Sequence, residues 1–344
     1  MAYQRVSTPR FMMGLGLFAR HHGIATFTSE AYEPFFKLNP AKSKSLNIPG
    51  NAQYDYVSTV LALPLGWINT IQYMAVLGHN FFKNEIAFRI YTRDLGGGNE
   101  TYISSDLGTV NCNPLPDYGY TFANVDGYSM LKFNNIIGSS NTEVVITMRG
   151  AGGTTFNIGD ISAGWIFDMS HSPDLSLKLS YQNESISTQT TKGGHSLTNS
   201  GWAEPPYWLN LPQWMTSDNT EGIGNYKGMT PATRRQYDLS FSFLADTGML
   251  NEYYPGDTAS QVGLMTGTML TDVGGNPYFN FTGMQDNFFS KVWMGTANGK
   301  LPFIFQPDKD VDEFAICKIN ADSFTLNQVA NNVYDVSVSL TEVW

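Results

Sequence analysis

The chain has 344 residues and a formal net charge of -10, with 42% apolar but only 15% charged residues. This apolar content excludes a disordered chain, and the length suffices for two domains or for one large β-domain. No basic stripe accompanies the acidic balance, which argues against duplex nucleic acid as a partner. Aromatic residues reach 14% and turn formers are frequent, so the composition predicts strands joined by turns.

Residues 1–46 are predicted to form an N-terminal arm. Phe11–Phe18 is apolar, but it is shorter than a membrane span and lacks a small-residue cleavage site. Two interpretations stay open for it: a loop or short helix packed on the body, or an arm that docks on another subunit. Without a secretion signal, the chain is expected to be made and assembled inside a cell.

Short apolar runs separated by turn signals fill residues 47–169. The predicted strands are Tyr73–Leu77, Ile86–Tyr91, Thr142–Met148 and Ile158–Phe167. Several short strands with turns between them are typical of a β-sandwich or jelly roll.

A resemblance rests on these runs. Met74–Phe81 followed by Ile86–Tyr91 resembles a pattern in structural proteins of tailed bacteriophages that carry a galactose-binding-like β-sandwich. Val144–Ile146 and Ile158–Gly164 are similar to the end of that domain. The resemblance implies a galactose-binding-like jelly roll over residues 47–169. In sugar-binding members, aromatic residues and an acid or Arg project from loops at one end.

Residues 170–344 form the second predicted domain. Leu175–Tyr181 and Arg234–Leu244 alternate between apolar and polar residues, as half-buried strands do. Asp286–Trp293 is predicted to be a short amphipathic helix. A polar stretch, Ser187–His195, leads into a segment dense in proline and tryptophan, which predicts a long ordered loop.

The aromatic residues of this loop are candidates for an interface or a ligand contact. They are Trp202, Tyr207, Trp208 and Trp214. Aromatic side chains carry much of the energy of interfaces and also stack on sugars. The alternative is that they fill the core beneath the loop.

The chain ends in a predicted strand, Tyr334–Leu340, in which apolar residues alternate strictly with small polar ones. An apolar terminus must be tied into a sheet or an interface, so Val343 and Trp344 are further candidates for contact. Together with Gly299–Asp308, this ending resembles the tail-tube or distal-tail type of phage protein. That resemblance implies a small sheet sandwich that forms rings by pairing its edges with neighbours.

Residues with catalytic or metal-binding chemistry form no recognised motif. The five histidines have no metal-ligand spacing, and His79 is interpreted as a satisfied turn histidine. Two buried thiols are favoured over a disulfide for Cys112 and Cys317, which lie far apart. A solvated turn is favoured over a calcium site for the acids of the Asp308–Glu313 segment, among them Asp308, Asp310 and Asp312.

From these features we predict an all-β chain of two β-sandwich domains, the second a tail-protein-like sheet domain with one short helix. The predicted function is that of a non-enzymatic structural component of a tailed-phage virion, in a tail or baseplate ring with copies of itself and other virion proteins. The alternatives are a carbohydrate-binding host-attachment protein that recognises a surface glycan, a glycan-degrading enzyme, and a head-decoration or connector protein. Neither a cofactor nor membrane insertion is expected.

Overall fold

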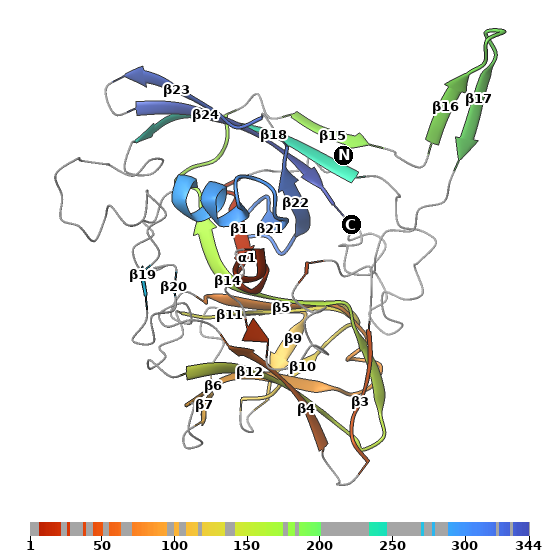
Figure 1. Ribbon diagram of the computed structural model, residues 1–344, viewed down its shortest axis with the longest axis vertical. Helices are drawn as coiled ribbons and strands as arrows, with labels where there is room; N and C mark the ends of the chain where they lie inside the picture. The colour runs from red at the N-terminus through yellow and green to blue at the C-terminus, as the bar shows by residue number, and fades with distance from the viewer. Residues whose placement is uncertain are drawn as a thin grey trace.

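The computed structural model is an all-β protein with few and short helices, which confirms the predicted fold class (Figure 1). The residues that it describes are 7–21, 26–27, 37–38, 44–50, 55–62, 71–94, 100–102, 108–115, 119–134, 142–174, 178–182, 186–200, 234–245, 270–271, 277–278, 288–320, 323–330 and 333–343.

The largest sheet has 11 strands and includes residues from both halves of the chain. Its strands are, in order, β15 (Lys178–Gln182), β18 (Arg234–Ala245), β24 (Val333–Glu342), β22 (Ala315–Ile319), β21 (Phe303–Gln306), β1 (Arg10–Gly14), β14 (Asp160–Asp168), β5 (Tyr73–His79), β11 (Gly127–Lys132) and β8 (Gly108–Val110). The eleventh strand, β23 (Thr325–Ala330), pairs with β24 outside this order. These pairings are antiparallel.

Strand β1 joins the two halves of this sheet. It pairs with β14 on one side and with β21 on the other. One sheet therefore runs across the boundary predicted between residues 169 and 170, and the division into two domains stays a prediction.

The Phe11–Phe18 segment is part of the body of its own chain. It forms most of β1 and the start of helix α1 (Leu15–His21), and Phe11, Met12 and Phe18 are buried there. The interpretation as an arm docked on another subunit was therefore wrong for these residues. The other interpretation was closer, although β1 is a strand inside the sheet rather than a loop on its surface.

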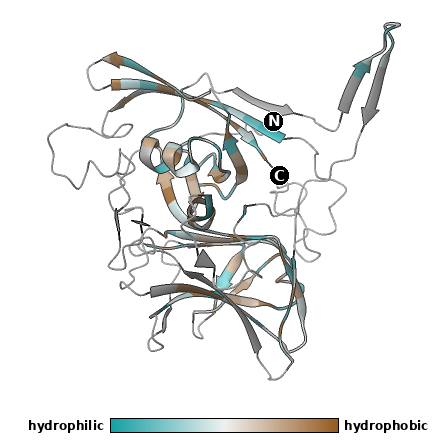
Figure 2. Ribbon diagram, viewed as in Figure 1, coloured by the Kyte–Doolittle hydropathy of each residue, from teal (hydrophilic) through white to brown (hydrophobic). Residues whose placement is uncertain are grey.

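A second sheet of seven strands packs against part of the first. Its strands are β2 (Thr26–Phe27), β4 (Asp55–Ala62), β12 (Thr142–Gly150), β6 (Ala87–Asp94), β10 (Thr121–Ala123) and β9 (Cys112–Pro114), with β7 (Glu100–Tyr102) paired to β6. It lies below β5 and β11 in the view of Figure 1. Met74 and Val76 of β5 belong to one buried cluster with Ile90 of β6 and Ile146 of β12. Figure 2 shows brown, hydrophobic stretches along these two layers, mixed with paler and teal ones.

The remaining described elements are small. Three two-stranded pairs are β3 (Lys44–Asn47) with β13 (Thr155–Ile158), β16 (Ile186–Thr190) with β17 (Ser196–Ser200), and β19 (Leu270–Thr271) with β20 (Pro277–Tyr278). The predicted Asp286–Trp293 helix is seen as a π-helical turn, η6 (Phe289–Trp293), followed by a 3-10 turn, η7 (Met294–Thr296). Phe288 and Val292 point its apolar face into the core.

Most of the predicted strands are confirmed. Tyr73–Leu77, Ile86–Tyr91, Thr142–Met148, Ile158–Phe167, Arg234–Leu244 and Tyr334–Leu340 correspond to β5, β6, β12, β14, β18 and β24, with ends shifted by a few residues. Leu175–Tyr181 corresponds to β15, and residues 175–177 lie outside the described part. The polar Ser187–His195 stretch, for which no element was predicted, contributes to β16 and its turn.

Candidate functional site

The predicted contact residues are mostly beyond what the structure describes. Trp202, Tyr207, Trp208, Trp214 and Trp344 lie outside the described residues. Val343 is described: its N–H donates to the carbonyl oxygen of Ile316 at 2.8 Å, and its side chain packs on the cluster that contains Ile304 and Ile316. Val343 is thus tied into the sheet of its own chain, as expected, and its role at an interface stays a prediction.

The terminal strand carries a buried charge that the sequence analysis missed. Val336, Val338 and Leu340 are buried, and the same face of β24 continues to Glu342, which is only 1% exposed. Both oxygens of this carboxylate accept hydrogen bonds from the Arg235 guanidinium, each at 3.1 Å, and one oxygen also accepts the Arg235 backbone N–H at 2.9 Å. The signal was present in the sequence, because Glu342 stands two residues after Leu340 in the period-two pattern.

Arg235 of β18 joins two further segments, strand β24 and the stretch 313–314 just before β22. Besides Glu342, its guanidinium donates to Glu313 Oε1 at 2.7 Å and to the carbonyl oxygen of Phe314 at 3.0 Å. Burial by itself disfavours the charged guanidinium, but the carboxylates of Glu342 and Glu313, which accept its hydrogen bonds, outweigh burial. The pKa of Arg235 is therefore raised above its ordinary value.

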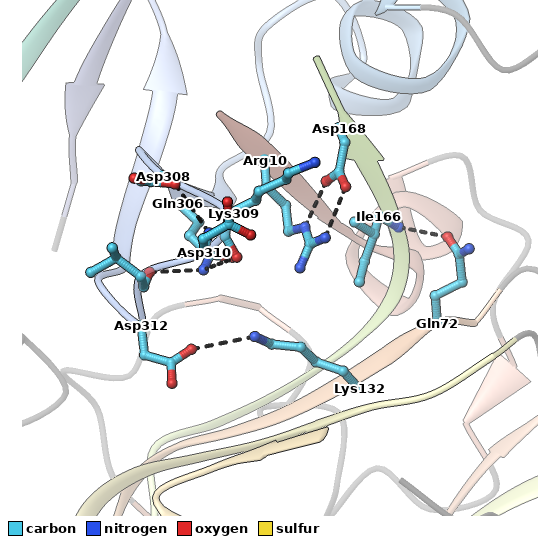
Figure 3. A network of polar contacts seen from close by, with 11 residues as sticks. Arg10, Gln72, Lys132, Ile166, Asp168, Gln306, Asp308, Lys309, Asp310 and Asp312 are labelled. Carbon is cyan, nitrogen blue, oxygen red and sulfur yellow. Dashed lines mark hydrogen bonds and ion pairs between the residues drawn. The ribbon is translucent and has the colours of Figure 1, made fainter. Parts of the chain in front are cut away.

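The acidic segment from Asp308 to Glu313 forms a turn whose acids contact basic residues of other strands (Figure 3). Asp308 accepts the backbone N–H of Asp310 at 3.1 Å, and the Asp312 carboxylate lies 3.4 Å from Lys132 Nζ on β11. Glu313 pairs with Arg235 as described above. Among the described residues, no three His, Cys, Asp or Glu side chains are grouped so that they could hold a metal ion.

Arg10 stands beside this turn and pairs with a different acid. Its guanidinium donates two hydrogen bonds to Asp168, at 2.6 and 2.8 Å (Figure 3). The hydrogen bond to Asp168 raises the pKa of Arg10 most, and the negative charges of Asp168, Asp310 and Asp312 add to it against the effect of burial. The acidic turn thus contacts β11 and β18 directly and acts on Arg10 of β1 through its charge.

His79 has hydrogen-bond partners for both ring nitrogens, as predicted, but it is the buried last residue of strand β5 rather than a turn residue. Its Nδ1 accepts the backbone N–H of Phe81 at 3.3 Å, so its Nε2 carries the proton and donates to Ser129 Oγ at 3.0 Å. The ring also stacks on Phe81, with centroids 4.4 Å apart. Burial lowers the pKa of His79 to about 3.

This low pKa makes stability depend on pH. The unfolded chain protonates His79 near its ordinary pKa of 6.5, whereas the folded chain keeps the ring neutral down to about pH 3. The unfolded state therefore binds more protons in this interval, and His79 lowers the free energy of unfolding by about 1.4 kcal/mol for each pH unit below 6.5. His79→Gln is expected to remove this slope, as measured by urea unfolding from neutral pH to about pH 4.5.

His195→Gln is the matched control, because the His195 side chain is exposed. It should leave the pH dependence as it is in the wild type. If the free energy of unfolding of His79→Gln depends on pH as steeply as that of the wild type, buried His79 is not the source of the pH dependence.

Cys112 and Cys317 are free and buried, which confirms the prediction of two buried thiols. Burial raises the pKa of Cys112 to about 12 and that of Cys317 well above its ordinary value. Because the thiolate is the nucleophile and the metal ligand, these two groups are poorly suited to either role.

The edge strands of the sheets differ in how well they are protected against pairing with a strand of another chain. Natural edge strands are shielded by shortness, charge or proline. The edge strands β2, β7, β8 and β9 have two or three residues each, and β15 begins with Lys178. By contrast, β23 has six residues, Thr325–Ala330, with neither charge nor proline, and only Leu326 among them is partly buried. Within the described residues β23 pairs only with β24, so we call it the open edge; Val329 on it is 48% exposed.

The chain matches no known protein family, and no curated protein or solved structure shows significant similarity to it. Within the described residues, no helix has the length and hydrophobicity that crossing a lipid bilayer requires.

Proposed function

We propose that this chain is a non-enzymatic structural component of a tailed-phage virion, and that copies of it assemble through sheet edges into a tail or baseplate ring. The observation that carries the proposal is the open edge. It is an exposed and uncharged strand attached to the core strand β24.

An edge of this kind suits assembly for a physical reason. An unpaired strand edge presents a row of backbone N–H and C=O groups, and another strand can pair with them. Because β24 is hydrogen-bonded to β18 on its other side, a strand added to β23 would extend the large sheet. The low charge of the chain, 15% of residues, suits a protein that buries much surface against neighbours.

The virion context rests on the resemblance of several segments to phage proteins. Met74–Phe81 is similar to a galactose-binding-like domain of phage structural proteins, and Gly299–Asp308 with the terminal strand is similar to the tail-tube or distal-tail type. These resemblances support the proposed tail or baseplate position, and a head-decoration or connector role is the alternative within a virion.

The test is the mass of the purified chain by light scattering over a concentration series. We expect a discrete multimer or growth with concentration. Val329→Lys places a charge on the open edge and is expected to shift the mass distribution towards the monomer. Its matched control is Val311→Lys, because Val311 is equally exposed, 47% against 48%, but lies in the acidic turn rather than on an edge.

A wild-type chain that stays monomeric at every concentration would contradict the proposed assembly. Equal effects of Val329→Lys and Val311→Lys would show that added charge alone, and not the open edge, controls association.

A further inference from the structure

Strands β16 and β17 form a ribbon that projects from the body of the molecule at the upper right of Figure 1. Their register runs from Ile186 opposite Ser200 to Thr190 opposite Ser196. The turn between them is closed by the Thr191 N–H donating to the His195 carbonyl oxygen at 2.8 Å. The described side chains from residue 189 to 196 are exposed, apart from the half-buried Thr191.

In the part of the chain that the structure describes, β16 and β17 pair only with each other, and their sequence does not protect their outer edges. The ten strand residues include neither charge nor proline, and the charged Lys192 lies in the turn. A two-stranded hairpin is at best marginally stable alone in water. A strand added to the ribbon would supply the pairing that it lacks.

The ribbon and the open edge match each other. The ribbon strands have five residues each and the open edge has six, and none of these strands carries a charge. In Figure 1 the open edge lies at the upper left and the ribbon at the upper right, on opposite sides of the molecule. One copy can therefore offer its ribbon to one neighbour while its open edge receives the ribbon of another.

We propose that the ribbon of one copy pairs with the open edge of a second copy. The inference rests on the proposed function and specifies which two surfaces meet between neighbouring copies. We call this contact the ribbon joint. The two surfaces that meet are different, so the contact is head-to-tail. A head-to-tail contact closes into a ring or continues as a filament, whereas contact between identical surfaces would stop at a dimer.

The test combines two variants that each lack one of the two surfaces. In the first, residues 187–199 are replaced by Gly-Gly, which can connect Ile186 to Ser200 because these two residues lie opposite each other. In the second, Asn327→Lys and Val329→Lys block the open edge. Each variant alone is expected to be a monomer by light scattering. An equal mixture is expected to give a dimer of one copy of each, because only one joint remains.

The outcomes separate this inference from the proposed function. If either variant alone still forms a multimer of the wild-type mass, the ribbon joint is wrong, although the protein does assemble. The same holds if both variants are monomers and their mixture forms no dimer. A monomeric wild-type chain would overturn both. Far-UV circular dichroism checks that the variants fold. If the shortened chain does not fold, Thr188→Pro disrupts the ribbon at full length and should give the same monomer.

Discussion

Arg235→Met is expected to lower the free energy of unfolding by about 3–5 kcal/mol. The substitution removes the cation that compensates the buried negative charge of Glu342, a carboxylate that is 1% exposed. An uncompensated buried charge is among the most destabilising changes that a single substitution can cause, because the charge has lost its water without gaining a partner. Denaturant unfolding followed by circular dichroism measures the effect.

Two further variants make this prediction specific. Arg10→Met removes a guanidinium from a pair that keeps contact with solvent, with side chains 18% and 35% exposed, so a loss of at most about 1 kcal/mol is expected. Arg235→Met combined with Glu342→Leu removes both buried charges and should recover most of the stability. Compensation of buried Glu342 by Arg235 is contradicted if Arg235→Met lowers the free energy of unfolding no more than Arg10→Met does. It is also contradicted if the double variant is as unstable as Arg235→Met alone.

Gly164→Ala is the other substitution with a large expected effect, a loss of about 3 kcal/mol or more. Gly164 lies opposite Gly14 where β14 pairs with β1. A Cβ at residue 164 would collide with the carbonyl oxygen of Met13 and lie 2.8 Å from the backbone nitrogen of Leu15. Both obstacles are backbone, so the clash is relieved only if β1 moves away from β14.

Gly50→Ala is the matched control, because the nearest atom to its Cβ would be the backbone nitrogen of Gly153, at 4.0 Å. Denaturation midpoints of the two variants give the comparison. A Gly164→Ala midpoint close to that of Gly50→Ala would contradict the close approach of β1 and β14.

The same experiment addresses the predicted division at residues 169 and 170. Strand β1 connects the strands of the two halves within one sheet. If this connection makes the chain a single cooperative unit, the wild type and Gly164→Ala each unfold in one transition, the variant at lower denaturant. Two separate transitions would support two domains that unfold independently.

The sequence by itself determined the class of the fold and most of its strands. The alternation of Tyr334–Leu340 and Arg234–Leu244 records a local fact, that successive side chains of a strand face opposite sides, and it needs no knowledge of the neighbours. The buried thiols and the satisfied His79 followed from residue type and local context in the same way.

Only the tertiary structure decided which strands are neighbours. Strand β1 lies between β14 and β21, more than a hundred residues away in the chain, and Arg235 meets Glu342 because β18 pairs with β24. The open edge is likewise a property of the sheet order and not of the Thr325–Ala330 segment. Side-chain periodicity fixes the face that a strand buries, whereas the strand that pairs with it depends on contacts between residues far apart in the sequence.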